Sequence, residues 1–133
     1  MTTTHVAALL DRFARAWQEL DGDQVLSCFA NSPTTTVIGT DEGEYFEGWE
    51  AYAQSWSSGR PSHVDKFSWG DSRHIDVVGD VAWSHGVIDF DITSTAARVS
   101  GSMWITCVSR RVAGRWLISH LHASFTAPVH FVV

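Results

Sequence analysis

The chain has 133 residues, the length of one domain, and 44% of them are hydrophobic whereas only 18% are charged. This composition excludes a disordered chain, and fifteen acidic against nine basic residues argue against nucleic acid as a partner. No run of about 18 apolar residues is present, and the first residues lack the parts of a signal peptide. We therefore expect no membrane partner and one cytoplasmic domain over residues 1–133.

The first third of the chain predicts helices. Apolar residues recur every three or four positions between Val6 and Leu20, which indicates an amphipathic helix with a preceding threonine as its N-cap. Gly22 is expected to end this helix in a left-handed turn. Asp23 is then expected to cap a second, short helix.

Two short strands and a third helix are predicted next. Residues 34–39 are rich in β-branched side chains, and residues 44–47 form a shorter candidate strand. The third helix follows Gly48. Four residues of this helix share one face and are aromatic or small: Trp49, Tyr52, Ala53 and Trp56.

The remainder of the chain predicts only strands, over about 63–77, 80–93, 96–111 and 115–125. Short turns between them require antiparallel pairing. The element order is therefore α-α-β-β-α-β-β-β-β, an α+β fold in which a curved antiparallel sheet wraps around three helices and leaves a cavity. We expect the apolar end, 126–133, to pack on the sheet or on a partner.

The last third of the sequence carries a family resemblance. Its closing hairpin resembles that of SnoaL-like proteins, which belong to the nuclear transport factor two-like superfamily together with the ketosteroid isomerases. The features that resemble the family are Thr106, Arg110-Arg111, Gly114-Arg115-Trp116, and the alternating Trp116, Ile118, His120, His122 and Ser124, together with Gly22-Asp23, Gly48-Trp49-Glu50 and Val81-Ala82-Trp83. The element order matches over about residues 5–125.

The resemblance implies a cystatin-like cone with an apolar pocket, in a protein that usually forms a homodimer. It implies no single activity, because relatives include isomerases, cyclases, dehydratases and non-catalytic domains. The ketosteroid isomerase triad is not reproduced, because the first helix has no tyrosine and the first strand has no acid. Asp41, in the following turn, is a candidate for a displaced base.

His120 and His122 are the first candidates for catalysis. Spaced by two on a strand, they point to one face, and the family pattern suggests that this face looks into the cone. There an imidazole could act as an acid or base, contact a ligand, or simply pack. A metal would need a third ligand from another strand, and no spacing supports one, so we expect no metal.

Other strand residues offer weaker candidates. The face of the 80–93 strand that carries Trp83, His85 and Asp89 is either exposed or part of a polar cavity, and a buried Asp89 could serve as an acid. Arg98 could bind a carboxylate or be solvated. The resemblance adds Thr106 as a ligand contact.

Seven tryptophans in so short a chain suggest an aromatic pocket or an interface. The residues expected to contact a ligand are Phe13, Trp17, Trp49, Trp56, Arg98, Trp104 and Thr106. Two functions remain open. The first is binding of a small apolar or aromatic molecule without a cofactor. The alternative is a cofactor-independent isomerase, cyclase or dehydratase that uses His120, His122, Asp41 or Asp89 on a small apolar or polyketide-like substrate.

Overall fold

The fold comes from a computed structural model that describes residues 2–58, 60–95 and 97–132, without the side chains of 130–132. Within these residues the elements are α1 (Thr2–Gln18), α2 (Gly22–Ser27), β1 (Thr36–Ile38), β2 (Tyr45–Glu47), α3 (Trp49–Ser55), β3 (His63–Trp69), β4 (His74–Val78), β5 (Val81–Thr93), β6 (Arg98–Val112), β7 (Arg115–Phe125) and β8 (His130–Val132). The predicted α+β class with a curved antiparallel sheet is confirmed.

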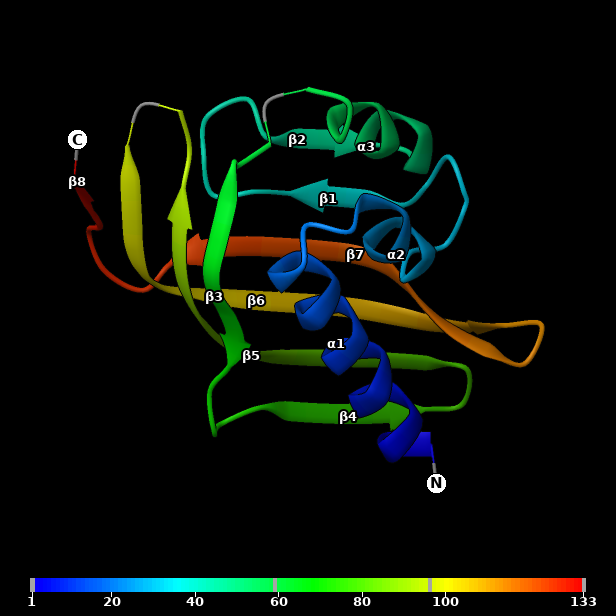
Figure 1. Cartoon of the computed structure of the whole chain (residues 1–133). Coiled ribbons are helices and arrows are strands. Elements are labelled where there is room, and N and C mark those ends of the chain that lie inside the picture. The colour runs from blue at the N-terminus through cyan, green and yellow to red at the C-terminus, as the bar shows by residue number, and fades with distance from the viewer. Residues whose placement is uncertain (1, 59, 96, 133) are drawn as a thin grey trace.

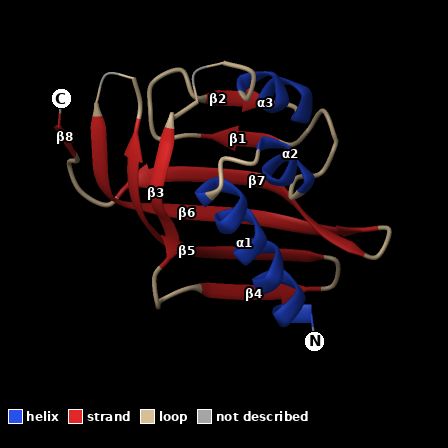
Figure 2. Ribbon diagram, viewed as in Figure 1, coloured by secondary structure: helices blue, strands red, loops and turns tan. Residues whose placement is uncertain are grey.

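One sheet contains all the strands, in the order β2-β1-β7-β6-β5-β3, and β4 and β8 pair with β5 and β6 respectively. Among the strand pairs of the described residues, only β1 and β7 run parallel. Helix α1 lies across one face of this curved sheet, and α2 and α3 lie near its β1–β2 end (Figures 1 and 2). The helices and the sheet thus form two layers with the core between them.

One detail of the predicted strands changes. The strand expected over 63–77 is two strands, β3 and β4, which pair with different parts of β5. The tail packs on the sheet as expected, because β8 pairs with the start of β6. Residue 96, the expected first residue of another strand, lies outside the described residues.

The joint between α1 and α2 also differs from the prediction. Leu20, not Gly22, takes the left-handed conformation, with φ of 53°. Asp21, not Asp23, caps α2, and its carboxylate accepts a hydrogen bond from the backbone N–H of Gln24. Gly22 is needed for space instead, because a Cβ there would lie 3.0 Å from the Trp56 ring.

A β-bulge in β7 decides which side chains face the helices. Ile118 pairs with Ser109 of β6, but Val108 pairs with His120, so Ser119 is an extra residue. Before it Ile118 is buried, and after it Leu121 is buried. The expected common face of Trp116, Ile118, His120, His122 and Ser124 is therefore wrong, because the first two residues point inward and the last three point to the opposite side.

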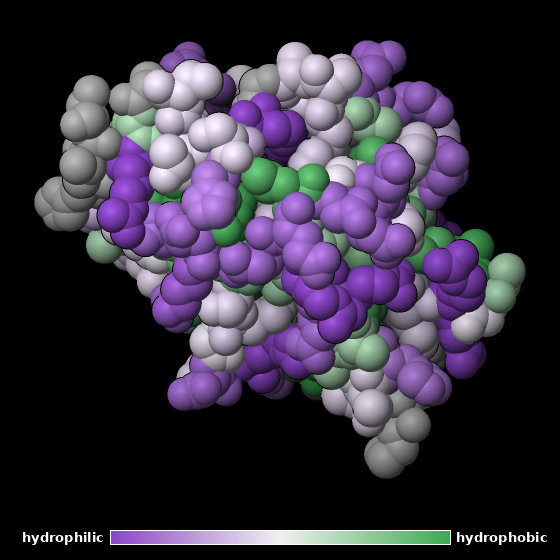
Figure 3. Space-filling model, in the orientation of Figure 1, coloured by the Kyte–Doolittle hydropathy of each residue, from purple (hydrophilic) through white to green (hydrophobic). Residues whose placement is uncertain are grey.

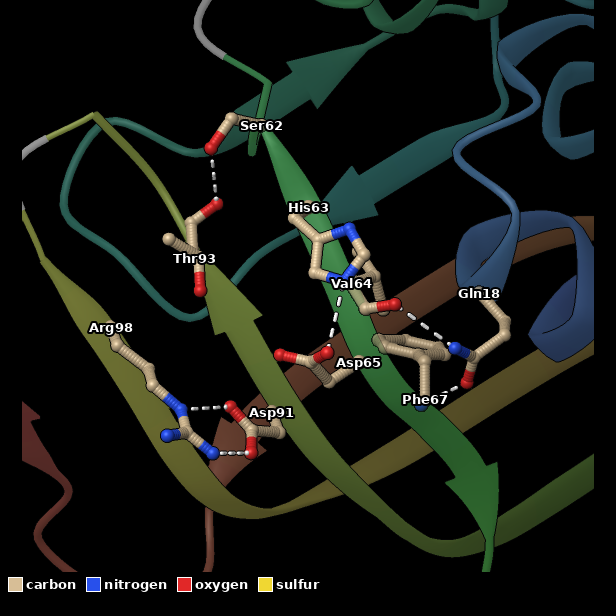
Figure 4. A network of polar contacts seen from close by, with 9 residues as sticks. All are labelled: Gln18, Ser62, His63, Val64, Asp65, Phe67, Asp91, Thr93 and Arg98. Atoms are coloured by element: carbon tan, nitrogen blue, oxygen red, sulfur yellow. Dashed lines mark hydrogen bonds and ion pairs between the residues drawn. The ribbon is translucent and has the colours of Figure 1, made fainter.

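The side chain of Gln18 joins α1 to the edge strand β3 (Figure 4). The amide of Gln18 donates to the carbonyl oxygen of Val64 at 3.0 Å and accepts from the N–H of Phe67 at 2.7 Å. The register of β3 shifts at Asp65, and both Val64 and Phe67 are buried. Gln18 thus satisfies two backbone groups at an edge that would otherwise stay open.

Replacing Gln18 by alanine should lower the free energy of unfolding by about 2 kcal/mol, because two half-buried backbone groups lose their partners. Urea denaturation followed by circular dichroism measures this. The matched control is Glu19→Ala, at the next and exposed position, which should change stability by less than about 0.5 kcal/mol. Equal effects of the two substitutions would contradict the role of Gln18.

Candidate functional site

A cavity of about 340 Å³ lies between the C-terminal half of α1, α3 and the inner face of the sheet. Its apolar walls come from both layers. They are formed by Phe13, Trp17, Val37, Phe46, Phe67, Phe90, Ile92, Val99, Met103, Ile105, Leu121, Ala123 and Phe125. Polar side chains lie among them at few positions, of which Asp41, Glu44, Tyr52 and Arg60 can be ionised.

Aromatic rings form a continuous wall on the helix side. Trp17 stacks on Phe67 with ring centroids 5.3 Å apart and meets Trp56 at 4.9 Å. Phe13 approaches Phe67 edge-on at 6.2 Å. Contacts of this kind fix ring orientations, so the wall is formed before any ligand arrives.

Tyr52 is the one buried polar side chain of the cavity lining, with 4% of its surface exposed. Its burial raises the pKa of the phenol to about 12, although the nearby indole of Trp56 and the positive charge of Arg60 act in the opposite direction. The phenol therefore stays neutral at ordinary pH and can donate a hydrogen bond inside the cavity.

Arg60 lies where the residues after α3 meet the cavity. Its Nε donates to the carbonyl oxygen of Ser55 at 3.0 Å, and Nη2 donates to Ser55 Oγ at 2.6 Å. The guanidinium lies over the Trp56 ring, 4.5 Å from the centroid. Burial lowers its pKa, but arginine remains a cation at ordinary pH.

The two acids of the lining come from the turn between β1 and β2. Asp41 is exposed and Glu44 is half-buried. The backbone N–H of Asp41 donates to Glu44 Oε1 at 2.8 Å, which ties the turn together. The charge of Glu44 acts to raise the pKa of both Tyr52 and Arg60, so these three residues lie close together and form the polar end of a mostly apolar cavity.

Three of the residues predicted from the sequence line this cavity: Phe13, Trp17 and Asp41. Trp49 and Trp56 are half-buried and stand behind the lining. The indole N–H of Trp49 donates to the carbonyl oxygen of Leu26 at 3.1 Å, which joins α3 to α2. These two tryptophans support the wall.

The other predicted site residues lie on the outer face of the sheet. They are Asp89, Arg98, Trp104, Thr106, His120 and His122, none of which lines the cavity. The expectation that the histidine face looks into the cone is wrong, because the bulge at Ser119 turns that face outward. Within residues 2–58, 60–95 and 97–132, no three His, Cys, Asp or Glu side chains are grouped to hold a metal ion.

Arg98 and Asp89 have partners on that outer face. The guanidinium of Arg98 forms a two-pronged ion pair with Asp91, in which Nε lies 2.8 Å from Oδ1 (Figure 4). The hydrogen bond and charge of Arg98 lower the pKa of Asp91. Asp89 accepts a hydrogen bond from Ser102 at 2.6 Å. Arg98 is therefore exposed to solvent and forms an ion pair with Asp91.

Sequence reasoning missed the polar end of the cavity. The helical spacing places Tyr52 on one face of the third helix with Trp49 and Trp56, and it makes no prediction for Arg60. A usable signal existed, since Arg60 precedes Pro61 in a stretch without other basic residues near it, close to three aromatic side chains of one helix. Glu44 gave no signal beyond its place in an acidic turn.

The comparisons with known proteins follow this geometry. The family model described as SnoaL-like domain matches residues 6–128. The chain belongs to the SnoaL-like domain family. A search of the curated proteins finds no match. No helix of the described part of this SnoaL-like chain is both long and apolar enough to cross a membrane.

Solved structures of low identity share the fold. An NTF2-like superfamily protein from Salmonella enterica has a TM-score of 0.83 at 17% identity, with 95% of this chain and 92% of that chain covered. A proposed scytalone dehydratase from Novosphingobium aromaticivorans has 0.80 at 11%, covering 98% and 91%. A proposed dehydratase of the NTF2-like family from Streptomyces avermitilis has 0.77 at 18%, covering 96% and 97%.

Proposed function

We propose that this SnoaL-like protein binds a small, mostly apolar molecule with an aromatic body in the cavity between α1 and the sheet. The observation that carries the proposal is the cavity itself, about 340 Å³ in volume and walled by aromatic and aliphatic side chains. Ligand sites in proteins are commonly cavities of roughly 300–1,000 Å³ with a few placed polar groups.

The wall favours an aromatic ligand. Trp17 and Phe67 stack on each other with 17° between their planes, so they form a fixed aromatic stack against which the ring of a ligand can pack. Apolar surface removed from water contributes about 25 cal/mol per Å² to binding, so a two-ring molecule would gain most of its affinity here. The polar end, with Tyr52 and Arg60, would fix its orientation.

Filling the cavity should abolish this binding. Ala123 lines the cavity, and Ala123→Leu should weaken binding of the neutral two-ring probe 2-naphthamide by about tenfold or more, as measured by equilibrium dialysis. Ser124→Leu is the matched control, since the neighbouring side chain of β7 is exposed on the outer face. Equal binding to both variants, each folded by circular dichroism, would contradict the proposal.

A second candidate function is proton transfer in the same cavity. A carboxylate and a neutral phenol both line it, in Asp41 and Tyr52. Asp41 could remove a proton from carbon next to a ketone while the Tyr52 O–H donates a hydrogen bond to the developing enolate oxygen, and the same proton could then return to another carbon. Two of the similar structures belong to proposed dehydratases.

The test of this candidate is deuterium exchange into a steroid enone in D₂O, followed by NMR. The wild-type protein should accelerate exchange over buffer, and Asp41→Asn should reduce that acceleration by about 10²-fold, because the variant has no base at this position. Wild type and Asp41→Asn that are equally inactive would remove the candidate, while leaving ligand binding as proposed.

The outer face of the sheet supports association with a second copy of this chain. The face that carries α1 is covered mostly by hydrophilic side chains (Figure 3). On the opposite side Trp83 and Trp104 are exposed by 43% and 45%, in cross-strand rows with Val108, Thr106 and the outward histidines. Asp76, beside Trp83, lies toward the β4 edge of the patch, whereas the rows through Trp104 and Thr106 have no Lys, Arg, Asp or Glu. A twofold axis through these rows brings the patch against itself without like charges.

Placing a carboxylate in this patch should separate the two copies. Trp104→Glu should sediment as a monomer at concentrations at which the wild-type protein sediments as a dimer, because two buried carboxylates would face each other. Val112→Glu is the control on the same strand, since Val112 is equally exposed, 45%, but lies in the β6–β7 hairpin. A wild-type monomer, or a Trp104→Glu dimer, would contradict the assignment.

A further inference from the structure

We propose that Arg60 and Tyr52 form an anion-binding subsite, so that the cavity selects an aromatic acid whose carboxylate pairs with Arg60. This inference rests on the proposed ligand binding and narrows it to one chemical class. It depends on the polar end of the cavity alone, whereas the proposed function depends on the apolar walls.

The first step asks whether the charge of Arg60 is paired within the protein. Three other arginines of the described residues are paired with acids: Arg73 with Asp11, Arg98 with Asp91 and Arg111 with Asp80. None of the ion pairs formed within residues 2–58, 60–95 and 97–132 includes Arg60, although its side chain is half-buried. The charge of Glu44 acts on Arg60 only from beyond ion-pair distance, so the guanidinium has lost part of its hydration without a direct carboxylate partner. Such a charge attracts an anion from solution.

The second step concerns the N–H donors of Arg60 that remain free. A guanidinium has five N–H groups, and the bonds to Ser55 use two of them, which leaves three. The contacts with Ser55 and the rings of Trp17 and Trp56, 5.6 and 4.5 Å from the guanidinium carbon, hold the plane of the group. A fixed plane with donors remaining suits a carboxylate, which arginine can bind with two parallel hydrogen bonds.

Tyr52 adds a neutral donor in the same lining. Because its phenol is not ionised at ordinary pH, it does not repel an anion, and its O–H can bond to a carboxylate oxygen. The aromatic wall of Trp17 and Phe67 would hold the ring to which the carboxylate is attached. The subsite therefore combines one cation, one neutral donor and a flat apolar surface.

The negative charge of Glu44 opposes the binding of an acid, so a substitution of Glu44 gives a second test of the subsite. Its carboxylate lines the same cavity but lies beyond ion-pair distance of Arg60, and Oε1 is engaged by the N–H of Asp41. Its negative charge would repel a bound carboxylate through the water-poor cavity. Removal of this charge should therefore strengthen binding of an acid, whereas removal of the Arg60 charge should weaken it.

The experiment compares 2-naphthoate with 2-naphthamide, two probes of nearly the same shape that differ in charge. Dissociation constants are measured by equilibrium dialysis for the wild-type protein, Arg60→Gln and Glu44→Gln. The wild-type protein should prefer the acid by about tenfold, as a charge-assisted pair requires. Arg60→Gln should bring the ratio of the two constants near one, and Glu44→Gln should increase the preference for the acid.

Two other outcomes would contradict the subsite. If 2-naphthamide binds the wild-type protein as tightly as 2-naphthoate does, and neither substitution changes the ratio, the anion subsite is wrong and the proposed function stands. If neither probe binds the wild-type protein, both the subsite and the proposed function are overturned. Binding of 2-naphthamide to Arg60→Gln shows that the variant is folded, and Glu44→Gln tests the subsite without touching the stacked guanidinium.

Discussion

One extra residue in β7 of this SnoaL-like protein determines which side chains of the strand face the helices and which lie on the outer face of the sheet. Because Ser119 is not matched in β6, Trp116 and Ile118 point to the helices before it, and Leu121 and Ala123 do so after it. Without the bulge the histidines would line the cavity in place of the aliphatic wall. The bulge has a cost, since among the described residues the buried hydroxyls of Ser109 and Ser119 have no hydrogen-bond partner.

The cavity follows from how the two layers meet. Gln18 fixes α1 on the edge of β3, and the aromatic rings of Trp17 and Phe67 then pack on each other and on Trp56. The rings of Trp17 and Phe67 pack in the core and also line the cavity. Function and stability are therefore carried by shared side chains, while Tyr52 and Arg60 supply the few polar groups that an apolar site needs for orientation.

The sequence predicted the order of elements because apolar spacing and turn residues are local signals. Alternation separated the two faces of the 80–93 strand, with Ile88 inward and Trp83 on the other side, but the expectation that Trp104 of the next strand contacts a ligand in the cavity is wrong, because Trp104 is exposed on the outer face. It failed in β7, because a bulge adds one residue without a sequence signature and reverses the alternation beyond it. The sequence marks Arg60 as an isolated basic residue, but its place in the same cavity lining as Tyr52 depends on where the chain after α3 returns to the sheet, which no local pattern encodes.

The most direct test of the account asks which tryptophans a ligand touches. Indole N–H signals of the ¹⁵N-labelled protein are recorded during titration with 2-naphthamide, and assigned by single Trp→Phe substitutions. Trp17, in the cavity wall, should shift, while Trp83 and Trp104, on the outer face, should not. Shifts of Trp83 and Trp104 with an unchanged Trp17 would place the ligand beside the outward histidines and contradict the account.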